Sequence, residues 1–124
     1  MPTQINFPLS PCDRETFRKL IESAQFSSQN IRNHALSVLD RKTDDDLQSL
    51  PDSISIDSGL FVSFLDALRV ARYCIEGKRS FSFMTTERVV VDDIECLWCL
   101  STYCNNFIIT LRPVEKQEEV AIVP

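Results

Sequence analysis

Residues 57–77 read DSGLFVSFLDALRVARYCIEG, and this stretch decides how the rest of the chain is interpreted. Its apolar residues recur every three or four positions for four turns, which is the period of one helix face. They are Phe61, Phe64, Leu65, Leu68, Ala71 and Ile75. The spacing predicts a central core helix that is capped by Asp57 or Ser58 and ends at Gly77 in a left-handed C-cap. The opposite, solvated face carries Asp66, Arg69, Arg72 and Glu76.

Three shorter helices are expected before the central one. The first runs from about Pro11 to Gln25 after an N-cap at Ser10, with Asp13 completing a capping box. The second presents one apolar face that holds Ile31, Ala35, Val38 and Leu39. The third follows an N-cap at Thr43, places three aspartates in its first turn and ends at Pro51.

From Lys78 onward the pattern favours strands, because aromatic and β-branched residues alternate with polar ones. Phe81, Phe83, residues 89–91 and residues 107–111 carry this signal, and Asp92-Asp93 and Asn105-Asn106 are turn-like dipeptides. Composition favours a strand for Ile94 to Cys104. A helix with Asp92 and Glu95 as its capping box remains an alternative there.

The order of these elements predicts an α+β fold in which three to four N-terminal helices pack on one face of a C-terminal antiparallel β-meander. The 124 residues fit a single globular domain, residues 1–124. Residues 1–9 are expected to form an extended N-terminal segment. Residues 114–124 are expected to form a short last strand or a tail.

The rare residues exclude several kinds of catalysis. The two glycines, Gly59 and Gly77, cannot build a phosphate-binding loop, so a nucleotide cofactor is not expected. His34 is the sole histidine, and no nucleophile signature surrounds any serine or cysteine. We therefore assign no catalytic residue, no metal and no cofactor, and we do not expect an enzyme.

The five cysteines include the spacing C-x2-C-x4-C at Cys96, Cys99 and Cys104, with Cys12 and Cys74 elsewhere. In a strand, Cys99 faces the side opposite to the other two, so a zinc site is not predicted. Acids upstream, at residues 92, 93 and 95, would raise the thiol pKa and disfavour a redox role. Mostly buried, reduced thiols are expected.

A cytoplasmic location and no membrane partner are also expected. The chain shows no basic-then-apolar leader and no run of about 18 apolar residues. Reduced cysteines are typical of the same compartment.

Charge is distributed unevenly along the chain, whose formal net charge is −5. A surface of this sign repels phosphate backbones, so a nucleic-acid partner is not expected. Residues 40–57 hold six acids and two bases, whereas residues 66–88 hold five bases and three acids. The acidic segment is our candidate contact for a basic partner protein. Its acids are Asp40, Asp44, Asp45, Asp46, Asp52 and Asp57.

These observations predict a small acidic protein-protein interaction module that acts as an inhibitor, an immunity-type protein or an adaptor. One alternative is a homodimeric secretion or folding chaperone, with a dimer face on an apolar strand edge or at Phe26 and Trp98. Another is a cofactor-free hydrolase that uses two carboxylates. Its candidates are Glu87, Asp92, Asp93 and Glu95.

Overall fold

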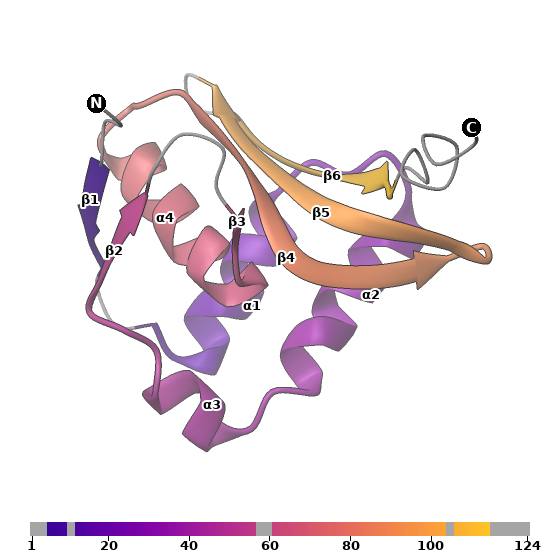
Figure 1. Cartoon of the computed structure of the whole chain (residues 1–124), viewed down its shortest axis with the longest axis horizontal. Helices are drawn as coiled ribbons and strands as arrows, with labels where there is room; N and C mark the ends of the chain where they lie inside the picture. The colour runs from indigo at the N-terminus through magenta and orange to yellow at the C-terminus, as the bar shows by residue number, and fades with distance from the viewer. Residues whose placement is uncertain (1–4, 10–11, 57–60, 104–105, 115–124) are drawn as a thin grey trace, which may run out of the picture.

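The computed structural model describes residues 5–9, 12–56, 61–103 and 106–114. Its element order, drawn in Figure 1, is β1 (Ile5–Pro8), α1 (Arg14–Ser23), α2 (Gln29–Asp40), α3 (Asp44–Gln48), β2 (Ser53–Ile56), β3 (Phe61–Val62), α4 (Phe64–Glu76), β4 (Phe81–Val91), β5 (Ile94–Tyr103) and β6 (Asn106–Pro113). Helices precede the long strands, and the predicted α+β layout is confirmed.

The large sheet has the strand order β3-β4-β5-β6. Strands β4, β5 and β6 are antiparallel neighbours, as the predicted meander requires, and β3 adds a short parallel pairing at the edge. Asp92 and Asp93 form the two-residue turn between β4 and β5 with φ of 53° and 64°, the left-handed values that this tight hairpin needs. A separate antiparallel pair joins β1 to β2.

The strand prediction for Ile94 to Cys104 is confirmed for the ten residues of β5. Tyr103 pairs with Asn106, so Asn106 belongs to strand β6 rather than to the predicted Asn105-Asn106 turn; residues 104 and 105 lie outside the described residues. The predicted last strand near Val120 to Val123 also lies outside them.

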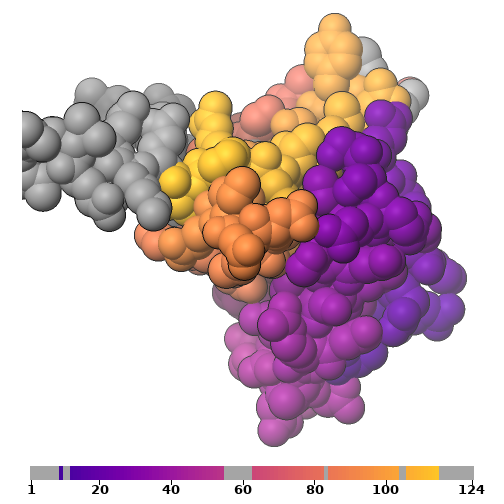
Figure 2. Space-filling view, turned by 90° about the vertical axis from the view of Figure 1, so that its right-hand side faces the viewer, coloured from indigo at the N-terminus to yellow at the C-terminus, as the bar shows by residue number. Residues whose placement is uncertain are grey.

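Helix α4 is the centre of the fold. It packs on β4, β5 and β6, and α1 packs on both α4 and α2. Phe64 of α4 meets Trp98 of β5 with ring centroids 4.9 Å apart, and both side chains are fully buried. Other fully buried large side chains are Phe17, Ile21, Leu39, Leu68, Leu100 and Ile109. Figure 2 shows the helical residues (indigo to magenta) and the strand residues (orange to yellow) as two adjoining masses.

Burial of Trp98 contradicts its prediction as part of a dimer face. Alternate residues of β5, from Cys96 to Thr102, turn toward the helices, and Trp98 lies in the middle of that row. Its Nε1 is buried and has no hydrogen-bond partner among the described residues. Phe26 is half-buried, and it packs against the same core.

Two predicted helix starts are wrong. The N-cap of α1 is Asp13 rather than Ser10: its carboxylate accepts a hydrogen bond from the Thr16 N–H at 2.8 Å, and the helix spans Arg14–Ser23 instead of Pro11 to Gln25. The N-cap of α4 is Ser63 rather than Asp57 or Ser58. Phe61–Val62 pair with β4 as strand β3, which delays the start of α4 until after them.

The left-handed residue after α4 is Lys78, one position later than the predicted Gly77. Gly77 has an ordinary φ of −88°, and Lys78 takes the left-handed conformation with φ of 54°. The Lys78 N–H donates to the Ile75 carbonyl at 3.1 Å and the Arg79 N–H donates to the Cys74 carbonyl at 2.7 Å. This pair of bonds is a Schellman motif, and its left-handed position is one that glycine usually fills.

Lys78→Gly is therefore expected to raise the free energy of unfolding by about 1 kcal/mol, because it removes the penalty of a side chain in the left-handed region. Gly77→Ala is the companion variant. Its φ is negative, and an added Cβ would lie at ordinary contact distance, 3.4 Å, from the Tyr73 carbonyl oxygen. Urea unfolding should show no loss of stability for either variant. A destabilised Lys78→Gly would contradict the assignment of the left-handed residue.

Candidate functional site

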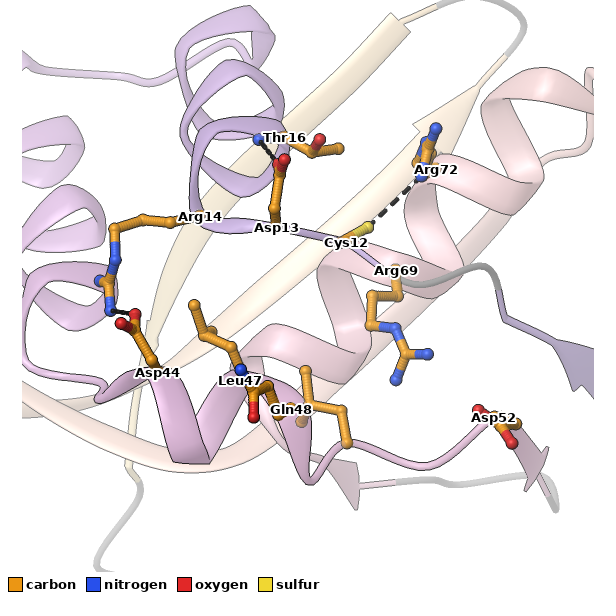
Figure 3. A pocket seen from close by; sticks show the side chains of 11 residues that line it. Cys12, Asp13, Arg14, Thr16, Asp44, Leu47, Gln48, Asp52, Arg69 and Arg72 are labelled. Carbon is orange, nitrogen blue, oxygen red and sulfur yellow. Dashed lines mark hydrogen bonds and ion pairs between the residues drawn. The ribbon is translucent and has the colours of Figure 1, made fainter.

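A groove of about 770 Å³ opens between the N-terminal end of α1, the helix α3, the residues just before β2 and the middle of α4. Figure 3 shows these four segments around the groove. They are far apart in sequence and meet only because α1 packs on α4 and the β1–β2 pair brings residue 52 back beside them. The site is therefore a product of tertiary structure rather than of a local motif.

Two arginines of α4 line one side of the groove. Arg69 and Arg72 are three residues apart and so share one helix face, and Figure 3 shows Arg69 extending into the space between Gln48 and Asp52. The Arg69 side chain is only 3% exposed, and its Nη1 donates to Asp66 Oδ1 at 3.1 Å. The prediction that Arg69 lies on a solvated face is wrong, because its side chain is buried.

Arg72 is more exposed and is held from both sides. Its Nε lies 3.2 Å from Glu76 Oε1, and its Nη1 contacts the Cys12 Sγ at 3.4 Å. Cys12 is half-buried and lines the groove. Each groove arginine of α4 therefore has an acidic neighbour on its own helix, which offsets its positive charge.

Arg14 ties the other side of the groove together. Its guanidinium donates to the carbonyl oxygens of Leu39 at 2.8 Å and Lys42 at 2.7 Å, and it pairs with Asp44 at 3.2 Å. The carbonyls at a helix C-terminus lack partners within the helix and attract cations. Arg14 therefore supplies the C-terminal cap of α2 from another helix, and it fixes α3 beside α1.

The six predicted contact acids have different environments. Asp44 and Asp52 line the groove, and Asp45 is exposed on the same short helix. Asp40 pairs with Arg18 at 3.2 Å. Asp46 completes the predicted cap of α3: its carboxylate accepts the Thr43 N–H at 2.7 Å while the Thr43 hydroxyl accepts the Asp46 N–H at 3.1 Å. Asp57 lies outside the described residues.

Sequence reasoning missed most of the groove. It did not single out Cys12, Arg14, Leu47 or Leu50, and it assigned Arg69 and Arg72 to solvent. The spacing of Asp66 and Arg69 was the available signal, because an acid and an arginine three residues apart on a core helix can pair and be buried together.

The cysteines of β5 that the structure describes do not converge on one site. Cys96 is buried on the helix-facing side, Cys99 is half-buried on the opposite side, and Cys104 lies outside the described residues. Burial raises the pKa of the Cys74, Cys96 and Cys99 thiols, so the cause is desolvation rather than the upstream acids. Within the described ranges, no group of three or more His, Cys, Asp or Glu side chains is placed to hold a metal ion.

The carboxylates proposed for hydrolysis serve other contacts. Glu87 accepts the Phe64 N–H at 3.0 Å, at the start of α4, and lies 3.7 Å from the Lys42 Nζ. Glu95 pairs with Arg88 at 3.0 Å, and residues 92 and 93 form the hairpin turn. None of these four residues lines the groove. His34 is half-buried on α2 and does not line it either.

Searches of protein-family models, of curated proteins and of solved structures found no match to this chain. No helix among the described residues is both long and apolar enough to cross a membrane.

The two helix caps predict a pH dependence of stability. Hydrogen bonds from the Thr16 hydroxyl and N–H lower the pKa of Asp13, and bonds from the Thr43 N–H and hydroxyl lower the pKa of Asp46. A folded pKa below the unfolded value stabilises the protein above the unfolded pKa, and this contribution is lost as the pH falls through the folded pKa. Stability should therefore fall between about pH 5 and pH 3.

Asp13→Asn combined with Asp46→Asn should make that fall shallower, because asparagine caps a helix without titrating in this range. Urea unfolding at both pH values measures the effect. Glu22→Gln combined with Asp93→Asn is the control, because it removes two exposed carboxylates that cap no helix. An unchanged slope in the cap variant would contradict the assigned role.

Thiol labelling tests the burial of the cysteines. In the native protein, Cys12 should react with iodoacetamide faster than Cys74 and Cys96, because it opens into the groove while the other two are buried. Mass spectrometry of the digested protein resolves the three positions. Equal rates at Cys12 and Cys74 would be incompatible with this packing.

Proposed function

We propose that the chain is a protein-binding module of the inhibitor, immunity-protein or adaptor kind, and that its groove takes a segment of the partner protein. The observation that carries this proposal is the groove itself. Its volume of about 770 Å³ falls in the range of ligand-binding clefts, and its lining combines charged side chains with two leucines.

The apolar part of the lining supports a protein segment as the occupant. Leu47 and Leu50 are half-buried at the edge of the core and both line the groove. An apolar side chain of a partner that packs between them would remove exposed apolar surface from water. The polar rim around such an anchor is typical of protein interfaces.

The charges favour a partner segment with basic residues beside its apolar anchor. Arg69 and Arg72 already have the carboxylates of Asp66 and Glu76 beside them, so they offer little uncompensated positive charge. Asp52 lines the groove and Asp45 lies on α3, the helix that borders it; both are exposed, and neither forms an ion pair with another described residue. The net charge of −5 would also speed the approach of a basic partner.

We also propose a cytoplasmic location. The four cysteines within the described residues form no disulfide, and free thiols persist in a reducing compartment.

Peptides supply a direct test of the groove. A short peptide with a leucine between two lysines should slow iodoacetamide labelling of Cys12 at millimolar concentration, whereas the same peptide with glutamates in place of the lysines should not. Asp45→Asn combined with Asp52→Asn should weaken binding of the lysine peptide about two- to thirty-fold, since each exposed charge pair contributes about 0.2–1 kcal/mol.

Glu22→Gln combined with Asp93→Asn is the matched control, because it changes the net charge equally at positions outside the groove. Affinity purification with both variants extends the test to natural partners. A partner retained by the wild type and the control but lost by the variant with Asp45→Asn and Asp52→Asn supports the proposal. Equal protection of Cys12 by both peptides, or equal retention by both variants, contradicts it.

A further inference from the structure

The outer edge of β4 is open over its last four residues. On this side β3 pairs only with Met84 and Thr85, and the register between β4 and β5 shifts after Met84 and resumes at Arg88. Among the described residues, no strand pairs with the outer edge of β4 from Arg88 to Val91.

The hairpin geometry determines which backbone groups this edge presents. Val91 and Ile94 flank a two-residue turn, so they form a hydrogen-bonded pair with each other, as do Val89 and Cys96 two residues further along. The N–H and C=O groups of Arg88 and Val90 therefore point away from β5. Four unpaired backbone groups are available to an added strand.

The opposite edge of the sheet, at β6, is covered, whereas the edge at β4 is open. Gln25 lies beside β6: its N–H donates to the Phe107 carbonyl at 2.8 Å, and its carbonyl accepts the Ile109 N–H at 3.1 Å. Pro113 ends that strand. A covered edge and a terminal proline are both common protections against strand addition, whereas residues 89–91 of β4 are a run of three valines with neither.

Exposed apolar side chains gather at the same hairpin. The structure describes three exposed large hydrophobic residues, and two of them belong to this hairpin: Val90 on β4 at 61% and Ile94 on β5 at 52%, on opposite faces of the sheet. Figure 2 shows this hairpin (orange) at the surface, facing the viewer. Val90 itself lies on the unpaired edge, and an exposed apolar side chain on such an edge is typical of a strand that accepts a partner.

We propose that a second copy of this chain adds antiparallel to β4, with the two-fold axis at Val90. A two-fold axis makes the contact reciprocal, so the outward N–H and C=O groups of one Val90 bond those of the other. The two three-stranded meanders then form one continuous sheet across the dimer. This inference does not depend on the groove or on what the groove binds.

Charge complementarity supports both the second copy and its register. Pairing about Val90 brings Arg88 of one copy toward the Asp92-Asp93 turn of the other, twice across the axis. Arg88 is 57% exposed, and its Nη1 contacts Glu95, which leaves other guanidinium donors for a second carboxylate. Two chains of net charge −5 repel each other at long range, so local pairs of this kind are needed at a self-contact.

Sedimentation velocity across a concentration series tests the proposal. The full chain should show a monomer–dimer equilibrium with a dimer of twice the chain mass. Val90→Pro removes the outward N–H without touching a β4–β5 bond, and Val90→Lys brings two positive charges together at the axis. Each should raise the dimer Kd at least about tenfold. If Val90→Pro does not fold, the dimer Kd of Val90→Lys provides the test.

Tyr103→Lys is the control, because it replaces the third exposed hydrophobic residue, at the far end of β5, and should leave the dimer unchanged. Amide hydrogen exchange supplies a second readout: the Val90 amide should gain protection as the protein concentration rises. A wild-type chain that stays monomeric at every concentration overturns the proposal. A dimer that survives both Val90 variants, or in which the Val90 amide stays unprotected, also overturns it.

Discussion

Phe64 on α4 and Trp98 on β5 join the helical part of the chain to the sheet, with ring centroids 4.9 Å apart and neither side chain exposed. The start of α4 is fixed at this contact, because the Phe64 N–H bonds Glu87 of β4 while Ser63 caps the helix. Once α4 is set on the sheet, its other faces are available to α1 and to the groove. The positions of Arg69 and Arg72 therefore follow from an aromatic contact on a different side of the same helix.

The groove and the open edge of β4 both remain because the described elements that pack around the sheet do not extend over them. The described helices cover one side of the sheet, Gln25 covers the edge at β6, and β3 covers only two residues of β4. Arg14 meanwhile makes three hydrogen bonds that hold α2 and α3 beside α1. Two surfaces are left with incomplete contacts, and they lie on different elements.

Local patterns allowed most of the fold to be predicted. The stripe through Phe64 and Leu68, the three aspartates after Thr43 and the alternation in β5 each depend on neighbours within one element. The helix caps were less predictable, since Asp57, Ser58 and Ser63 are all suitable residues and pairing of β3 with a distant strand decides among them. The groove could not be predicted, because its walls come from four separated segments. Of the six acids selected by charge, Asp44 and Asp52 line it.

Trp98 is the sole tryptophan of the chain, and its indole is fully buried with no hydrogen-bond partner for Nε1 among the described residues. An indole in apolar surroundings emits at shorter wavelength than one in water. The molecule therefore carries its own optical reporter at the contact between α4 and the sheet, and one emission spectrum distinguishes a packed core from a loosened one. Because Trp98 does not line the groove and Val90 pairs with Glu95 rather than with Trp98, substitutions in the groove or at Val90 can be checked for intact packing without an added label.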